Sequence, residues 1–230
     1  MKIALISDIH ANLEAFEEVL KDIKKRNIKN ILCAGDIVGF GANPNECCKL
    51  VKDNNIVSVK GNFDVDVITL KDAKKYDENL VTSLQWTNKQ LTDKNKDFLI
   101  KLPKMNSINL KDLKILLVHA SVTDPFHGRI TQQTSDDVLR EELRRSKSNI
   151  LVIGHTHIPM VKRLNNSLII NPGSVGQPRD NRNLASYAIL ETEVKSVNIV
   201  RIKYDIDTAS KKIITSGLPR HLADRLFSGN

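Results

Sequence analysis

The feature that most constrains the fold is an alternation of short apolar runs and amphipathic segments in the first quarter of the chain. Residues 2–6, 31–34 and 56–59 are apolar runs of the length expected for strands buried on both faces. Apolar residues recur at helical spacing from Leu13 onwards, and Pro44 begins a second helical segment. This order predicts a parallel sheet whose strands are joined by crossover helices.

The rest of the chain adds further short strands and helices. Residues 77–101 are polar with helical spacing, and another helix is predicted from Ser135 or Asp136 to about Lys147. Strands are predicted at residues 105–110, 114–118, 150–153, 160–164, 168–170, 185–191 and 197–203. The polar turns between the strands from residue 150 onwards predict antiparallel pairing there. We therefore expect an α/β fold in which two sheets pack face to face with helices outside.

No segment has the composition of a linker between independent domains. We expect a single domain over residues 1–230, in which residues 205–230 form a helical C-terminal extension packed on the rest. No apolar run is long enough to span a bilayer, and the first run ends at Ser7, too early for a signal peptide. Together with three cysteines, interpreted as reduced thiols, these features predict a cytoplasmic protein without membrane partners.

Polar residues that can bind metal follow the predicted strands. Seven such residues are Asp8, His10, Asp36, Asn62, His119, His155 and His157. Each lies just after an apolar run, and in α/β folds the loops at the carboxyl ends of the strands meet at one edge of a sheet. We therefore expect the seven side chains to point into one cleft, although they are far apart in the sequence.

The residue types suit two metal ions that share a ligand. One candidate set is Asp8, His10, Asp36 and His157, and the other is Asp36, Asn62, His119 and His155. Asp36 would bridge the ions because a carboxylate has two oxygens, and Asp36, Asn62 and His119 are also the candidate catalytic residues. Oxygen and imidazole ligands without thiolate favour Mn, Fe, Zn, Ni or Co over Mg or Ca, and we expect Mn first. Two such ions can lower the pKa of a shared water and clamp the oxygens of a phosphoryl displacement.

At these residues the sequence resembles the calcineurin-like metallophosphoesterase superfamily, and its further motifs resemble the small prokaryotic phosphodiesterase branch. The matching segments are Ser7–Asn12, Gly35–Gly39, Gly61–Asp64, Val118–Ser121 and Gly154–His157, followed by Gly39–Pro44, Asn171–Asp180 and Gly217–Leu226. The resemblance covers essentially the whole chain. It implies a four-layer α/β/β/α sandwich of two mixed sheets, with a dinuclear metal site at its edge. It also implies a phosphoesterase that hydrolyses phosphodiesters by attack of a metal-activated hydroxide.

Two positions depart from the family pattern. Ala11 stands where the family commonly has glycine; if that position needs a positive φ, alanine costs about 1 kcal/mol, although we expect the backbone to tolerate it. Phe63 stands where many phosphomonoesterases of the family have a histidine that assists the leaving group, and phenylalanine cannot donate a proton. We therefore expect phosphodiesters or activated esters to be preferred over alkyl monoesters. Asp64, which usually orients that histidine, is expected to cap the following helix.

Two other classes of function stay open. The first is a catalytically weak protein-interaction scaffold, because an endosomal-coat scaffold of the same superfamily also has phenylalanine at the position of Phe63. The second is a nuclease or nucleotide phosphatase, because the net charge of +8 favours anionic partners. Basic residues cluster in two groups, namely Arg140, Arg144, Arg145 and Lys147, and Lys71, Lys74 and Lys75. Glu141 and Glu142 interrupt the first group, which favours a solvated helix face over a nucleic-acid site.

Candidate substrate contacts are Asn12, Phe63, His127, Arg129 and Arg179. Asn12 is expected to cap a helix and also to face the cleft. His127 and Arg129 belong to a loop that could lie over the cleft, and Arg179 is a candidate phosphate clamp. The expected partner is a phosphate-ester small molecule or a nucleotide, while the physiological substrate, the native metal and the formation of a homo-oligomer stay open.

Overall fold

The computed structural model describes residues 1–70, 77–110 and 113–230. Its strands are β1 (Lys2–Ile6), β2 (Asn30–Cys33), β3 (Val57–Ser58), β4 (Met105–Leu110), β5 (Leu113–Val118), β6 (Ile150–Val152), β7 (Met160–Leu164), β8 (Ser167–Asn171), β9 (Ala185–Glu191) and β10 (Ser196–Ile202). Its helices are α1 (Leu13–Lys25), α2 (Pro44–Asp53), α3 (Asn62–Thr69), α4 (Glu78–Gln90), α5 (Asp93–Lys101), α6 (Asp136–Ser146), α7 (Ile206–Thr215) and α8 (Arg220–Ser228). The predicted strands and helices are present, with their ends shifted by one or a few residues.

The strands form two five-stranded sheets. Sheet A has the order β10-β9-β1-β2-β3, and sheet B has the order β4-β5-β6-β8-β7. β1, β2 and β3 are parallel, as predicted, and β9 is antiparallel to both β1 and β10. In sheet B, β5, β6 and β8 are parallel, while β4 and β7 are antiparallel to their neighbours. The predicted antiparallel pairing is therefore wrong for β6, which is parallel to β8 because β7 lies at the edge of the sheet and not between them. β6 is also parallel to β5, since α6 crosses over between these two strands.

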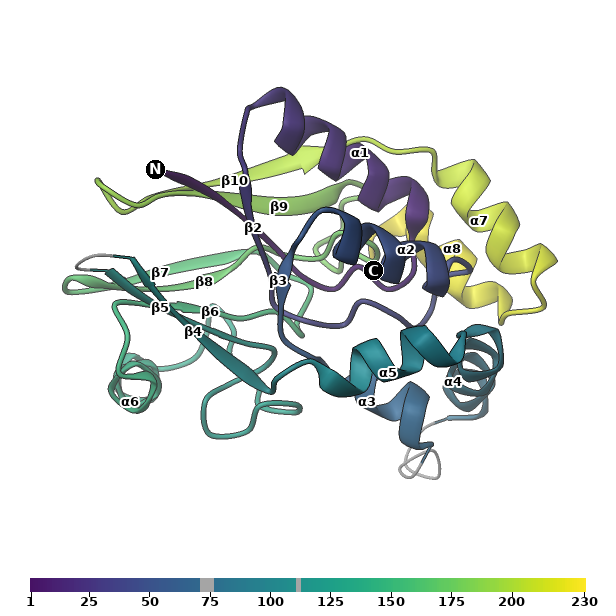
Figure 1. The fold of residues 1–230 in the computed structure, drawn as a ribbon, viewed down its shortest axis with the longest axis horizontal. Helices are drawn as coiled ribbons and strands as arrows, with labels where there is room; N and C mark the ends of the chain where they lie inside the picture. Colours follow the sequence, from purple (N-terminus) through teal and green to yellow (C-terminus); the bar gives the residue numbers. More distant parts are fainter. Residues whose placement is uncertain (71–76, 111–112) are drawn as a thin grey trace.

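The two sheets pack face to face, and helices cover their outer faces (Figure 1). The apolar residues accordingly form three cores: one between sheet A and α1 and α2, one between the sheets, and one between sheet B and α6. Ala4 and Ile6 enter the first core, whereas Ile3 and Leu5 enter the second. Successive residues of β1 separate in this way because side chains alternate across a strand. The fold is the four-layer α/β/β/α sandwich of two mixed sheets.

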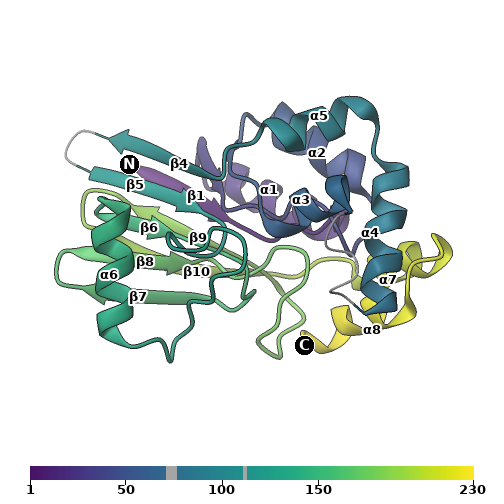
Figure 2. The same ribbon diagram turned by 90° about the horizontal axis from the view of Figure 1, so that it is seen from below.

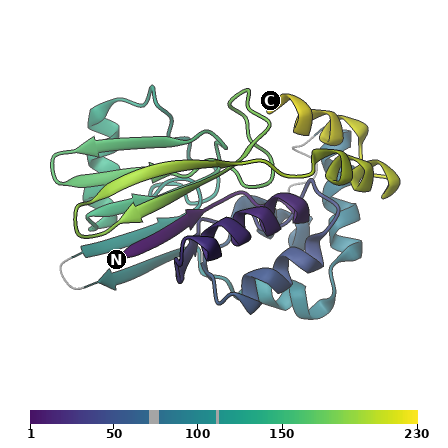
Figure 3. The ribbon, with the colours of Figure 1, turned by 90° about the horizontal axis from the view of Figure 1, so that it is seen from above.

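Most of the remaining helices lie at one end of the sandwich. α3, α4 and α5, together with α7 and α8, gather beyond the carboxyl end of β1 (Figure 2). Figure 3 shows the C-terminal helices at this end, beyond the strands and away from the N-terminus. Ile213, Leu222 and Leu226 of these helices belong to the first core, so α7 and α8 pack on the rest of the chain. Among the described helices, none combines the length and the apolar character needed to cross a bilayer.

Candidate metal centre

The loops that follow the parallel strands of both sheets meet at this end of the molecule. The residues they carry are Asp8 and His10 after β1, Asp36 after β2, Asn62 after β3, His119 after β5, and His155 and His157 after β6. Six of the seven side chains are at most 5% exposed, and His155 is half-buried. Seven polar residues buried together, at the edge where parallel strands end, form a candidate ligand site.

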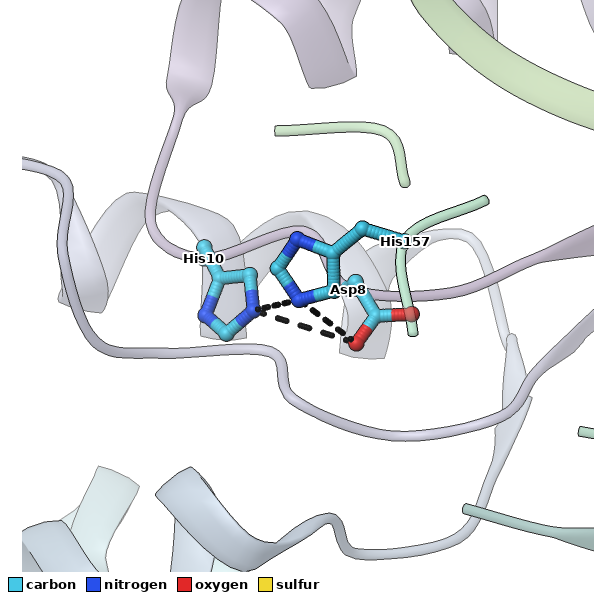
Figure 4. A group of neighbouring side chains, drawn as sticks. All are labelled: Asp8, His10 and His157. Atoms are coloured by element: carbon cyan, nitrogen blue, oxygen red, sulfur yellow. Dashed lines mark hydrogen bonds and ion pairs between the residues drawn. The ribbon is translucent and has the colours of Figure 1, made fainter. Parts of the chain in front are cut away.

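Asp8, His10 and His157 form the first group of donor atoms (Figure 4). The Nε2 atoms of His10 and His157 are 3.0 Å apart. Asp8 Oδ1 lies 3.3 Å from His157 Nε2 and 3.8 Å from His10 Nε2. Asp36 approaches the same group, since its Oδ2 lies 3.7 Å from His10 Nε2. The four residues expected around one ion are therefore together.

The second group lies on the other side of Asp36. His119 Nε2 is 3.3 Å from Asp36 Oδ2 and 3.0 Å from Asn62 Oδ1. His155 Nδ1 is 3.1 Å from the same Asn62 oxygen. Asp36 Oδ2 thus faces both groups, which is where a bridging carboxylate is expected. Asp8 also has an oxygen within 4.8 Å of donors of Asp36 and His119, a proximity that the sequence analysis did not predict.

Backbone carbonyl groups fix the ring nitrogens of three histidines. His10 Nδ1 lies 3.2 Å from the oxygen of Val38, and His157 Nδ1 lies 2.5 Å from the oxygen of Gln177. His119 Nδ1 likewise lies 2.8 Å from a backbone oxygen. A carbonyl oxygen can only accept, so Nδ1 carries the proton in each neutral ring and Nε2 presents a lone pair to the centre. Two lone pairs 3.0 Å apart beside carboxylates need a cation or a proton between them, so this donor set fits divalent metal ions.

Burial and neighbouring charges set the protonation of these histidines. Burial and the charge of His157 lower the pKa of His10 to about 3. Burial and the charge of His119 lower the pKa of His155 to about 4. Burial would also lower the pKa of His119, but Asp36 outweighs it and raises that pKa to about 9. His10 and His155 are therefore neutral ligands at pH 7, whereas a metal ion would have to displace a proton from His119.

The backbone at the centre is strained. Left-handed φ angles occur at five of the seven residues, namely Asp8 (+54°), His10 (+47°), Asp36 (+53°), His155 (+67°) and His157 (+62°). Each costs about 1 kcal/mol or more, although Asp and His adopt this conformation more readily than bulky residues. Hydrogen bonds between the two loops of sheet A hold the conformation, for example from His10 N to Asp36 O at 3.0 Å. Strained positions of this kind cluster at functional sites.

Two glycines allow the loops to approach the carboxylates closely. A Cβ atom at Gly61 would lie 2.0 Å from Asp36 Oδ1. A Cβ atom at Gly154 would lie 1.9 Å from Ser7 Oγ and 2.6 Å from Asp8 Oδ2. Any larger residue would displace the carboxylate at either position, so the glycines before Asn62 and His155 are required by the geometry of the centre.

The geometry agrees with three comparisons to known proteins. The family model of the calcineurin-like phosphoesterase superfamily domain matches residues 1–195. The chain belongs to this superfamily. A crystal structure of a metallophosphoesterase from Sphaerobacter thermophilus has a TM-score of 0.84 and 32% identity to this chain, and each chain is covered completely. Membership of a metal-dependent family and the converging ligand groups together support a metal-binding hydrolase.

Two curated relatives extend the comparison. An uncharacterized protein of Methanocaldococcus jannaschii is 40% identical over 242 aligned positions, which cover 99% of this chain and 98% of the relative. The phosphodiesterase YfcE of Escherichia coli is 26% identical over 207 positions, covering 86% of this chain and 91% of YfcE. The similarity therefore extends along nearly the full length of both relatives, in agreement with the resemblance seen in the motifs.

The structure shows how the chain accommodates its departures from the family pattern. Ala11 has a φ of +52°, so the position needs the left-handed conformation that glycine adopts more easily. Phe63 is 8% exposed, and its ring centre lies 4.4 Å from that of Phe40 and 5.2 Å from that of His10. Its backbone N–H donates to Asp36 Oδ1 at 2.8 Å. The ring of Phe63 thus places an apolar group directly beside His10.

The side chain of Asp64 accepts hydrogen bonds from three backbone N–H groups. Its Oδ2 accepts from Gly61 N at 2.9 Å, which caps α3 as predicted. Its Oδ1 accepts from Ile37 N at 2.9 Å and from Val38 N at 3.2 Å. The buried carboxylate therefore joins the loop that carries Asp36 to the start of α3, a role that the sequence analysis did not predict.

The candidate substrate contacts separate into different environments. Asn12 caps α1 by accepting from Ala15 N at 3.1 Å, and its Nδ2 donates to Gly176 O at 2.8 Å. The polar atoms of Asn12 are therefore engaged within the protein. His127 and Arg129 are exposed, and no described hydrogen bond or ion pair joins either of them to the seven ligands.

Arg179 lies beside the centre. Its guanidinium carbon is 5.9 Å from the ring centre of Phe40, and that ring centre is 4.6 Å from the ring centre of His10. Phe40 and Gln177, which the sequence analysis did not single out as site residues, both contact Arg179. In the sequence, only their place within the matching motifs pointed to these two residues. The group of Gln177 that contacts His157 is its backbone oxygen, which every residue has and which a sequence therefore does not reveal.

Two of the four cations in the basic group at the end of α6 share one carboxylate. Arg144 and Arg145 both form ion pairs with Glu141, at 2.7 and 2.6 Å. Glu142 instead accepts from Val122 N at 2.5 Å, which fastens α6 to the loop after His119. The second basic group, at residues 71, 74 and 75, lies outside the described residues.

Proposed function

We propose that this phosphoesterase holds two divalent cations and hydrolyses phosphodiesters in preference to alkyl phosphomonoesters. The observation that carries the proposal is the pair of Nε2 atoms of His10 and His157, 3.0 Å apart beside Asp8, with both Nδ1 atoms turned to backbone oxygens. Without a cation, these lone pairs and the carboxylate have no stable common partner except a proton.

The ligand sets follow from the distances. Asp8, His10, Asp36 and His157 would hold one cation, and Asp36, Asn62, His119 and His155 would hold the other. Oxygen and imidazole donors without thiolate favour Mn²⁺, with Fe, Zn, Ni or Co as alternatives. All three cysteines are buried and unpaired, and none belongs to the candidate metal groups of the described residues.

Different residues of the chain would have different roles toward a bound phosphate. When bound, the two cations would lower the pKa of a shared water and neutralise charge on the phosphoryl oxygens. Asp36, which belongs to both ligand sets, would hold them at a fixed separation. Asn62 and His119 would orient the reacting groups on one side of Asp36. Arg179 would contact the phosphate from the other side, because its guanidinium lies against Phe40 next to His10.

The preference for diesters rests on Phe63. An alkyl monoester loses an alkoxide that needs a proton, and the ring of Phe63 has none to give. A diester with a more acidic leaving group needs less assistance. The 26% identical relative YfcE bears the name phosphodiesterase, which is consistent with this preference.

The experiment exchanges Phe63 for histidine and compares it with Phe63→Leu. With Mn²⁺ bound, Phe63→His should raise hydrolysis of the alkyl monoester β-glycerophosphate by about 100-fold, the low end of what a general acid contributes. Phe63→Leu also opens space but adds no acid, so it should not raise that rate. An equal gain in both variants, or no gain in Phe63→His at full metal content, would contradict the explanation.

A further inference from the structure

Two neutral groups hold the side chain of Arg179 beside the metal centre. Its guanidinium carbon lies 5.9 Å from the ring centre of Phe40, and one Nη atom donates to Gln177 Oε1 at 3.0 Å. Its buried Nε has no hydrogen-bond partner in the described part of the chain, and the neighbouring carboxylate of Asp180 pairs with Arg201 instead. A guanidinium is always charged, so Arg179 keeps a positive charge that neither of its two partners neutralises.

Phe40 has an unusual backbone conformation that sets its ring between Arg179 and the ligands. Its φ is +61°, which is rare for a bulky residue, and its side chain is only 5% exposed. The ring centre lies 4.6 Å from that of His10, and the next residue is fastened to the same ligand because Gly41 N donates to His10 O at 3.0 Å. Strain of this kind is retained where the placement of a side chain matters to the site.

Gln177 joins the same arginine to the other histidine of the first ligand group. Its backbone oxygen contacts His157 Nδ1, and its backbone N–H donates to Ser174 Oγ at 2.7 Å. Arg179 N also donates to His157 O, at 3.5 Å. The residue is 2% exposed, so its side-chain amide is held in place. An amide oxygen accepts from a guanidinium without carrying a negative charge, and the charge of Arg179 therefore remains available to an anion.

We propose that Phe40 and Gln177 are positioning residues that hold the guanidinium of Arg179 in place for a phosphate group bound at the metal centre, and that they do so without neutralising its charge. This inference rests on the proposed phosphoesterase function of the same centre. Phe40 sets the guanidinium against His10, and Gln177 ties it to the loop of His157. Arg179 therefore binds phosphate without first losing the freedom of a long, mobile side chain.

The test is a pair of double-mutant cycles read by calorimetric binding of inorganic phosphate to protein fully loaded with Mn²⁺. Phe40→Leu and Gln177→Met are each measured alone and combined with Arg179→Gln. Each single variant should weaken phosphate binding about threefold to tenfold, the range of a cation–π contact or a hydrogen bond. In the Arg179→Gln background the same replacements should change the affinity less than about twofold, because they act through the arginine. A general loss of structure would lower the affinity equally in both backgrounds.

Phe63→Leu is the matched control. Its ring also packs on His10, with 5.2 Å between ring centres, but it makes no cation–π contact with Arg179 in the described ranges. Any effect of Phe63→Leu should be the same in both backgrounds. Equal losses in both backgrounds for Phe40→Leu and Gln177→Met, or unchanged phosphate affinity in Arg179→Gln, would overturn the positioning role alone. Absence of phosphate binding by the fully metallated wild type would overturn the proposed function together with this inference.

Discussion

Replacing Ala11 by glycine tests whether the backbone strain at the centre is real. Ala11 is fully buried with a φ of +52°, and its conformation is held by hydrogen bonds from its own N–H to Ile37 O and from Asn43 N to its carbonyl oxygen. The left-handed conformation costs alanine about 1–2 kcal/mol, which glycine recovers. The lost methyl group costs about 0.8 kcal/mol, and the freer unfolded chain costs roughly 0.4–1 kcal/mol. The sum is close to zero.

Ala188→Gly provides the comparison. Ala188 is also fully buried but lies inside β9, where φ is not left-handed. Its replacement loses the methyl group and gains only the penalty of glycine in a strand, so the loss should be about 1.3–1.8 kcal/mol. For a chain of this length that corresponds to a fall in melting temperature of roughly 3–7 °C.

The assay is urea unfolding of both variants and the wild type with chelator present, so that metal binding does not contribute. Ala11→Gly should stay within about 1 kcal/mol of the wild type, because strain relief offsets its losses. Ala188→Gly should be clearly less stable. If both variants lost the same stability, the strain assigned to Ala11 would be refuted.

Three further predictions concern the supports of the centre and the outer surface. Gly154→Ala should lower the affinity for Mn²⁺, measured by calorimetry, about tenfold or more. Gly217→Ala is the control and should leave this affinity unchanged, because the added Cβ would meet nothing within 4 Å. Asp64→Asn should lower the free energy of unfolding by about 1–3 kcal/mol in urea, because an amide cannot accept from all three N–H groups; an unchanged midpoint would contradict this. Burial opposes ionisation of Asp22, but a hydrogen bond from Arg26 and one from a tyrosine of β9 lower its pKa. Ionised Asp22 therefore stabilises the fold above its unfolded pKa, and this stabilisation is lost as the pH falls through its lowered folded pKa. Asp22→Asn should accordingly lose less stability than the wild type below about pH 4. Parallel curves of unfolding free energy against pH for the two proteins would exclude this contribution.

Much of the fold could be predicted because its signals are local. The apolar run at residues 2–6 and the helical spacing after Leu13 depend only on neighbouring residues, and β1 and α1 lie where they were expected. The direction of β6 was missed because a three-residue apolar strand reads the same in parallel and antiparallel pairs. The helix predicted between residues 135 and 147 was the available signal, since it is the crossover that makes β5 and β6 parallel.

At the candidate site, too, some features could be predicted from the sequence and others could not. Each of the seven residues follows a strand, so their convergence could be predicted from order alone. The supporting contacts could not, because they use backbone groups: the carbonyl oxygen of Gln177 at His157, or the N–H groups that Asp64 accepts. The contact between the end of α8 and Asn181 carried no signal either, because nothing in an amphipathic helix indicates which distant loop its end will contact.

The most direct measurement is hydrolysis of bis(p-nitrophenyl) phosphate and p-nitrophenyl phosphate by protein stripped of metal and reloaded with Mn²⁺, with metal content determined on the same sample. We predict two ions per chain, no turnover by the stripped protein, and restored turnover that is faster on the diester. Two bound ions without turnover of either ester would contradict it and favour the protein-interaction scaffold. Turnover that persists in the stripped protein would contradict the metal centre itself.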